Sequence, residues 1–314
     1  MTGGRARLTF LGTGTSQGVP IIGCKCEVCR SKDERDKRFR ASVFVEYEGL
    51  NILVDAGPDF RMQMLRLGIS HLDAILLTHN HKDHTGGLDD VRSLNYVDRR
   101  AAEIYCERNV LEDLIREYPY VFKFPKYPGA PEWMLHVIDE RPFILRKDTA
   151  EKELVWVHDI GYHYRLPNGQ LIPTARCLND MIDNAPVAIA GDATAISIIP
   201  IRGLHDKLPV LGFRFGDIAY ITDMSTLPES EFAKLEGLKH LTLNTVSYNT
   251  HHSHFSLQET LDLADRIRPE HTWLTHLSHS FPVHEAFQKE LERMCQEQHI
   301  HSIVRPAYDG LVIE

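Results

Sequence analysis

A short polar run in the first third of the chain, His79-Asn80-His81-Lys82-Asp83-His84, contains four side chains of the kinds that bind metal ions. In an irregular loop, residues two positions apart can point the same way. We therefore expect His79 and His81 to bind one ion, and Asp83 and His84 to turn towards a second. Neutral imidazole and carboxylate suit zinc, iron or manganese. A solvated histidine-rich loop is the alternative, but four ligand-type residues in six positions favour a metal site.

The elements that position this chemistry follow one repeated pattern, a short apolar strand and then a polar residue able to bind metal. The pattern occurs at 74–77 before His79, 196–201 before His205, 218–221 before Asp223, 241–243 before Asn244 and 272–274 before His276. Wholly apolar strands indicate sheets covered on both faces, and α/β sites lie at the carboxyl ends of strands. We therefore expect these polar residues to gather at such an edge.

Other segments predict the framework around that edge. Residues 8–11 read as a strand before a glycine-rich loop at 12–18, and residues 42–47 and 51–54 read as a hairpin. Helical spacing of apolar residues occurs at 60–67, 257–267 and 283–296. Residues 118–190 are rich in aromatic residues and proline and are predicted to be an insertion or cap. We expect most of its aromatic rings to pack, although a stacking wall for a substrate is the alternative.

Composition limits the class of protein. The 314 residues are 43% hydrophobic and 25% charged, as in globular domains, and no run of about 18 apolar residues predicts a membrane span. The polar N-terminus does not resemble a signal peptide, so we expect a cytoplasmic protein. The net charge of −9 argues against binding long nucleic acids by their phosphates.

The six cysteines do not form a disulfide framework, because three are clustered and three are scattered. Cys106, Cys177 and Cys295 are expected to be ordinary packing residues. Among the 18 histidines, His71, His158 and His299 are expected at the surface.

The loop from His79 to His84 resembles the HxHxDH motif of the metallo-β-lactamase superfamily. The CxCxxC of Cys24, Cys26 and Cys29, after a glycine-rich first loop, is similar to the PhnP branch of phosphodiesterases, as are Ser253-His254-Phe255-Ser256 and His276-Leu277-Ser278-His279. The resemblance covers nearly the whole chain and is weakest at 118–190. It implies an α/β fold, a four-layer αββα sandwich of two mixed β-sheets flanked by helices, as a single domain over residues 1–314.

The resemblance also implies roles for individual residues. One catalytic metal would be bound by His79, His81 and His205, and the second by Asp83, His84 and His276, with Asp223 bridging them. Catalysis would involve Asp83, Asp223 and His254, the last contacting phosphate or assisting the leaving group. Asp55 would orient the ligand loop. A separate structural zinc would be bound by Cys24, Cys26, Cys29 and His279; three free thiols or a redox pair is the alternative.

The activity implied is that of a metal-dependent phosphoric diester hydrolase. It would act on small or cyclic phosphodiesters, cyclic nucleotides included, through a water activated by two divalent metals, zinc, manganese or iron. The resemblance also suggests a homodimer. The alternatives are a tRNA 3′-processing-type endonuclease, a PqqB-like cofactor-biosynthesis protein, a non-catalytic metal-binding protein, and a lactamase or thioesterase. The sequence has no RNA-binding arm rich in Gly, Lys and Arg, which argues against the endonuclease. The set of potential metal ligands is complete, which argues against a non-catalytic protein, so hydrolysis of a small phosphodiester is favoured.

Overall fold

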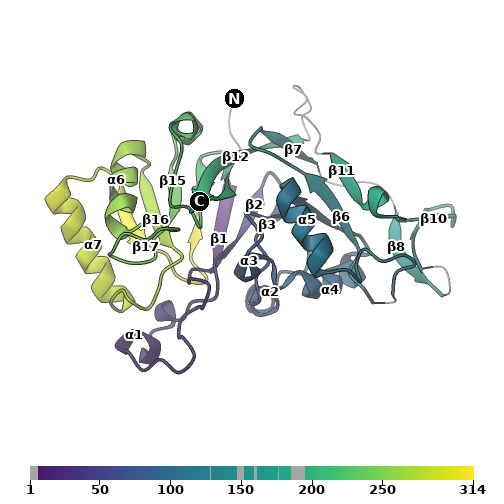
Figure 1. Cartoon of the computed structure of the whole chain (residues 1–314), viewed down its shortest axis with the longest axis horizontal. Helices are drawn as coiled ribbons and strands as arrows, with labels where there is room; N and C mark the ends of the chain where they lie inside the picture. The colour runs from purple at the N-terminus through teal and green to yellow at the C-terminus, as the bar shows by residue number, and fades with distance from the viewer. Residues whose placement is uncertain (1–5, 128, 147–151, 159–160, 176, 185–194) are drawn as a thin grey trace. The chain divides into compact units, whose positions relative to one another are not determined.

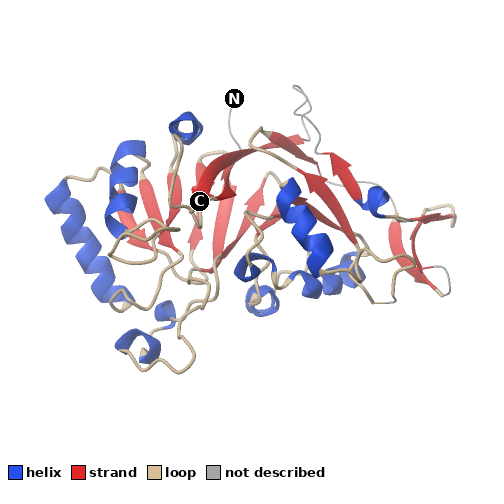
Figure 2. Cartoon of the chain, in the orientation of Figure 1, coloured by secondary structure: helices blue, strands red, loops and turns tan. Residues whose placement is uncertain are grey.

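The computed structural model describes residues 6–127, 129–146, 152–158, 161–175, 177–184 and 195–314. The chain divides into two compact units. The first unit comprises Met1–Glu48 and Ile198–Glu314, and the second comprises Gly49–Ser197. Both units combine strands with helices (Figure 2), which confirms the α/β class with mixed β-structure.

The first unit contributes strands to two sheets. In one, β1 (Ala6–Gly12) pairs antiparallel with β2 (Ser42–Tyr47) and with β18 (Val312–Ile313). The other has the order β17-β16-β15-β14-β13-β12, which is parallel from β14 to β17 and antiparallel from β12 to β14. These strands are β12 (Ala195–His205), β13 (Leu208–Phe215), β14 (Ile218–Tyr220), β15 (His240–Asn244), β16 (His271–Thr275) and β17 (Ile303–Pro306).

The directions of these strands decide where the site residues lie. Since β12 and β14 both run antiparallel to β13, they point the same way, and β15 and β16 point with them. The carboxyl ends of all four strands therefore share one edge, as the pattern of strand-end polar residues predicts.

The helices of the first unit are α1 (Glu27–Arg30), η1 (Glu34–Asp36), η4 (Glu229–Leu235), α6 (Leu257–Ile267) and α7 (His284–Gln298). Figure 1 shows α6 and α7 beside β15, β16 and β17. Helix α6 begins at a capping box, in which the Ser256 hydroxyl accepts the Glu259 N–H and the Glu259 carboxylate accepts the Ser256 N–H. The apolar faces of both helices enter one buried cluster that includes Leu261, Phe287 and Leu274.

The second unit has a parallel sheet in the order β11-β6-β5-β4-β3. Its strands are β3 (Leu50–Val54), β4 (Ala74–Leu76), β5 (Ala102–Cys106), β6 (Trp133–Val137) and β11 (Ile182–Asn184), and β7 (Phe143–Arg146) follows β6 in the chain. The helices are α2 (Phe60–Leu67), α3 (Lys82–Thr85), η2 (Leu88–Val91), α4 (Arg92–Asp98), α5 (Arg108–Glu117) and η3 (Leu178–Met181). The helix expected at 60–67 is confirmed, and Gly68 ends it in the left-handed conformation.

Residues 118–190 contribute to the second unit in two ways. β6 and β11 extend its parallel sheet, while β8 (Glu153–Val157), β9 (Gly161–Arg165) and β10 (Leu171–Pro173) form an antiparallel sheet of their own. Residues 128, 147–151, 159–160, 176 and 185–190 of this stretch lie outside the described residues. Tyr118 and Phe122 pack edge-on against Trp133, the packing role expected for such rings.

Two expectations are corrected, one for Cys177 and one for the histidine loop. Cys177 is exposed rather than packed, whereas Cys106 is buried at the end of β5. His71 has 34% of its side chain exposed, in line with the expected surface position, and its two ring nitrogens lie 3.1 Å from Asp73 Oδ1 and 2.9 Å from Asp98 Oδ2. The expected loop at 78–84 ends in helix α3, since the N–H groups of His84 and Thr85 donate to the His81 carbonyl. Among the described residues, no helix is long and apolar enough to cross a membrane.

Candidate metal centre

In the second unit, the potential ligands follow the carboxyl ends of two adjacent parallel strands. Asp55 comes directly after β3, and Thr78 and His79 follow β4. The Asp55 carboxylate accepts the backbone N–H of Thr78 and the Thr78 hydroxyl, both at 2.9 Å. Its Oδ2 also lies 2.7 Å from Nδ1 of His84. Asp55 therefore ties the start and the end of the histidine loop to one buried group.

These contacts fix which ring nitrogen each histidine presents. A carboxylate oxygen accepts, so His84 carries its proton on Nδ1 and keeps the lone pair of Nε2 for a metal. The Thr78 hydroxyl donates to Asp55 and lies 2.9 Å from His79 Nδ1, which gives His79 the same tautomer. The ring of His79 lies 4.6 Å from that of His81 and 4.3 Å from that of His84. Burial raises the pKa of Asp55, and its contacts with His84 and Thr78 oppose that shift.

The close approach of Asp83 requires a glycine. A Cβ placed on Gly57 would lie 2.0 Å from the Asp83 carbonyl oxygen. The backbone after β3 and the backbone of α3 therefore pass in contact, held by the hydrogen bond from the Ala56 N–H to the His84 carbonyl at 2.8 Å. Gly57 thus sets the position of Asp83 and His84.

In the first unit, the strand edge described above brings together His205 from β12, Asp223 just after β14 and His276 just after β16. Nε2 of His276 lies 3.1 Å from Asp223 Oδ1. The other Asp223 oxygen, Oδ2, accepts the Thr222 hydroxyl at 2.6 Å. His205 Nδ1 donates to the Ser253 carbonyl at 2.6 Å, which leaves its Nε2 lone pair for a metal.

His254 joins this group. Its ring stacks on His276 at 4.6 Å and meets His205 edge-on at 4.6 Å. The potential ligand atoms of His205, Asp223 and His254 lie within 4.8 Å of one another. Burial, followed by the charge of His276, lowers the pKa of His254 to about 2. A neutral His254 ring suits hydrogen bonding to a substrate or coordination of an ion.

The backbone around these residues is held in an unusual conformation. Asp55, Asp223 and His276 have φ angles of 64°, 57° and 58°. This left-handed conformation costs a non-glycine residue roughly 1–2 kcal/mol and is concentrated at functional sites. Asn244, which follows the same strand-end pattern, supports the loop after Asp223. Its side chain accepts the Met224 N–H and donates to the Met224 carbonyl, both at 2.9 Å.

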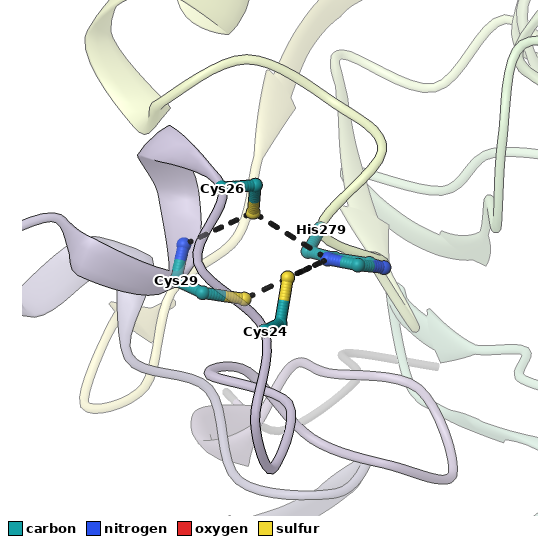
Figure 3. Close-up of side chains that lie close together, drawn as sticks. All are labelled: Cys24, Cys26, Cys29 and His279. Atoms are coloured by element: carbon teal, nitrogen blue, oxygen red, sulfur yellow. Dashed lines mark hydrogen bonds between the residues drawn. The ribbon is translucent and has the colours of Figure 1, made fainter.

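A second group in the first unit consists of Cys24, Cys26, Cys29 and His279. The three sulfur atoms lie 3.2, 3.5 and 3.6 Å from Nδ1 of His279, and Figure 3 shows them facing that ring. A tetrahedral zinc bound to sulfur and nitrogen would separate these ligand atoms by about 3.6 Å. The donor set and its spacing therefore fit a structural zinc site.

The pKa values of two of the thiols shift in opposite directions. The Cys29 N–H donates to the Cys26 sulfur at 3.4 Å. That bond lowers the pKa of Cys26 to about 6; burial opposes the shift, and the hydrogen bond with His279 adds to it. Burial raises the pKa of Cys29 to about 11, although the Ile21 N–H donates to its sulfur. A bound cation would favour the thiolate at both positions.

Only Leu277 and Ser278 separate His276 from His279. The Leu277 N–H donates to the Thr13 carbonyl at 2.8 Å, and the Thr15 N–H donates to the Leu277 carbonyl at 3.2 Å. The glycine-rich first loop therefore fixes the segment that links the two groups of ligands in this unit.

A buried network that sequence reasoning missed holds that loop. Arg38 donates to the Thr13 hydroxyl at 2.8 Å and to the Ala307 carbonyl at 2.6 Å. The Thr13 hydroxyl donates to Asp309 Oδ1 at 2.8 Å, and Asp309 Oδ2 accepts the Phe39 N–H at 2.6 Å. These partners are far apart in the chain, and no local spacing signals them.

Comparison with known proteins places the chain in a family. The family model described as the beta-lactamase superfamily domain matches residues 50–143 and 145–277 of this sequence. The crystal structure of a diphosphatase from the PhnP family is 30% identical in sequence, with a TM-score of 0.71, over 99% of this chain and 98% of that one. The chain therefore belongs to the metallo-β-lactamase superfamily, in its PhnP-like branch.

Two curated relatives match different shares of this chain. An octanoyltransferase of Porphyromonas gingivalis is 36% identical over 97% of this chain and 51% of its own length. A coenzyme PQQ synthesis protein B of Methylococcus capsulatus is 29% identical over 40% of this chain and 44% of its own. The chain thus spans about half the length of the octanoyltransferase that it matches.

Proposed function

We propose that this chain is a metal-dependent hydrolase of small phosphodiesters. The observation that carries the proposal is the grouping of His205, Asp223, His254 and His276 at one strand edge, with His205 held by Ser253 so that Nε2 faces away from the backbone. The family resemblance implies that His79, His81, Asp83 and His84 would be the other ligands. When bound, two divalent ions would activate a water and neutralise charge on the phosphate.

The residues of the chain itself would position the reactants. His79, His84 and His205 present Nε2 as a ligand because their Nδ1 atoms are engaged. His254, neutral and mostly buried, would hydrogen-bond a phosphate oxygen or the leaving oxygen. The Thr222 hydroxyl donates to one oxygen of Asp223, and the Asn244 side chain hydrogen-bonds the backbone of Met224, the next residue. These contacts keep the other Asp223 oxygen directed at His276.

The alternatives are less well supported. The octanoyltransferase is twice as long as its matched part, so its transferase activity can reside outside that part. An RNA-processing role fits poorly with a net charge of −9. The homodimer implied by the resemblance and the cytoplasmic location expected from the N-terminal sequence remain proposals, which light scattering and cell fractionation test.

The experiment combines elemental analysis with an assay on bis-p-nitrophenyl phosphate and 2′,3′-cyclic nucleotides. We expect about three metal ions per chain, two in the catalytic centre and one structural zinc, and hydrolysis of at least one substrate. Asp223→Ala should abolish hydrolysis. Asp217→Ala is the matched control, because Asp217 precedes β14 and so lies at the opposite end of that strand.

A protein that carries its metals and is inert towards every phosphodiester would refute the proposed function and leave the fold unaffected. Equal activity of the Asp223→Ala and Asp217→Ala variants would refute the assignment of the site.

A further inference from the structure

His251 extends the group of histidines beside Asp223. Its ring lies 5.3 Å from that of His254 and 4.6 Å from that of His252. Exposure rises along this row, from the His276 side chain at 2% and His254 at 12% to a partly exposed His251 and an exposed His252. The three rings His254, His251 and His252 therefore lead from the proposed ligands towards solvent.

Ser253 fixes the tautomer of His251. The Ser253 backbone N–H donates to His251 Nδ1 at 3.3 Å, and the Ser253 hydroxyl lies 3.1 Å from the same nitrogen. A backbone N–H can only donate, so His251 Nδ1 must accept and the ring proton must be on Nε2. In the part of the chain that the structure describes, no hydrogen bond reaches this Nε2–H.

Ser253 also fixes the tautomer of His205, but with the ring proton on Nδ1, because the Ser253 carbonyl accepts from His205 Nδ1. One residue thus gives two nearby histidines complementary roles. His205 presents an Nε2 lone pair, which suits a cation, whereas His251 presents an Nε2–H, which suits an anionic oxygen.

We infer that His251 Nε2–H binds an oxygen of a second phosphate group, one position further out than the phosphate beside His254, so that the site takes compounds with two adjacent phosphates. This inference rests on the proposed function, because it places the first phosphate at the metal ligands. Adjacent phosphates joined by one bridging oxygen would follow the row of rings outward. His251 is then a residue that determines specificity for diphosphates over simple phosphodiesters.

The test compares two ligands that differ by one phosphate. Binding of ADP and of AMP to the metal-replete protein is measured by calorimetry, for the wild type and three variants. His251→Asn keeps an oxygen that can accept the Ser253 N–H and removes the outward donor. His251→Gln restores an N–H group at the position of Nε2. His252→Asn is the matched control on the exposed neighbour.

We expect the wild type to bind ADP more tightly than AMP. His251→Asn should weaken ADP binding by about tenfold, the lower end of the effect of one hydrogen bond to a charged group, and change AMP binding less than twofold. His251→Gln should recover most of the loss, and His252→Asn should match the wild type. Melting temperatures should agree among the four proteins, which excludes a general loss of structure.

An equal loss for AMP and ADP in His251→Asn, or no loss for ADP, would overturn the inference. The same holds if His252→Asn weakens ADP binding as much. Hydrolysis of bis-p-nitrophenyl phosphate by a protein that does not prefer ADP would reject this inference alone. His251-dependent ADP binding without any hydrolysis would instead reject the proposed function and keep the phosphate contact.

Discussion

Replacing Thr13 with valine tests the buried network behind the first loop. Valine has nearly the same shape as threonine but lacks the hydroxyl that accepts from Arg38 and donates to Asp309, both at 2.8 Å. Arg38 and Asp309 are 7% and 5% exposed, so water cannot easily replace the lost partner. Burial lowers the pKa of Arg38 to about 10, because the charged guanidinium is poorly solvated there.

The expected magnitude follows from these contacts. A hydrogen bond to a charged group contributes about 1.5–3 kcal/mol, and two are lost. Arg38 keeps the Ala307 carbonyl and Asp309 keeps the Phe39 N–H, so we expect the lower end, about 3 kcal/mol. For a protein of a few hundred residues this loss lowers the melting temperature by about 6–12 °C.

The assay is thermal and urea unfolding of the wild type, Thr13→Val and Thr13→Ser. Serine keeps the hydroxyl, so Thr13→Ser should lose much less stability than Thr13→Val. A Thr13→Val protein that melts within about 2 °C of the wild type would refute the reasoning, since that change is under 1 kcal/mol.

Three further predictions concern single side chains. Ser256→Ala removes the N-cap of α6 and should lower the free energy of unfolding by about 1 kcal/mol, measured by urea unfolding with Ser247→Ala as control. Cys26→Ser should lose one zinc per chain by elemental analysis and lower the melting temperature, and an unchanged melting temperature would contradict a structural zinc. Partial burial lowers the pKa of His71, but its hydrogen bonds to Asp98 and Asp73 prevail and raise it above 6.5. The stability from His71 is therefore fully present below pH 6.5 and lost as pH rises through the raised pKa, so His71→Gln should destabilise more at pH 6 than at pH 9.

The ligand residues were predictable from the sequence because their signals are local. The spacing of His79 to His84 and the polar residue after each apolar strand depend on neighbouring positions only. The structure places His205, Asp223 and His276 at one strand edge as that pattern predicts, and it brings Cys24 and His279 together. Whether these residues bind metal stays a prediction.

What the sequence does not predict depends on contacts between distant residues. Thr13 and Asp309 are 296 positions apart, and nothing in either neighbourhood marks the pair. The strands β6 and β11 join the parallel sheet of the second unit by non-local pairing within a stretch that has no clear periodicity. Cys177 was expected to pack because thiols usually do, but its exposure depends on where that segment lies.

The short segment from His276 to His279 affects how metal-depletion experiments are interpreted. Leu277 is hydrogen-bonded to Thr13 and Thr15 of the first loop, and the three cysteines of the proposed zinc site follow that loop. Loss of zinc releases both His279 and the cysteines, so we expect it to loosen both anchors of the 276–279 segment and to displace His276. A chelator that removes only the proposed zinc would then lower activity as well. Inhibition by chelators reports on both groups of ligands at once, and replacing one metal with another, rather than stripping metals, is the experiment that separates them.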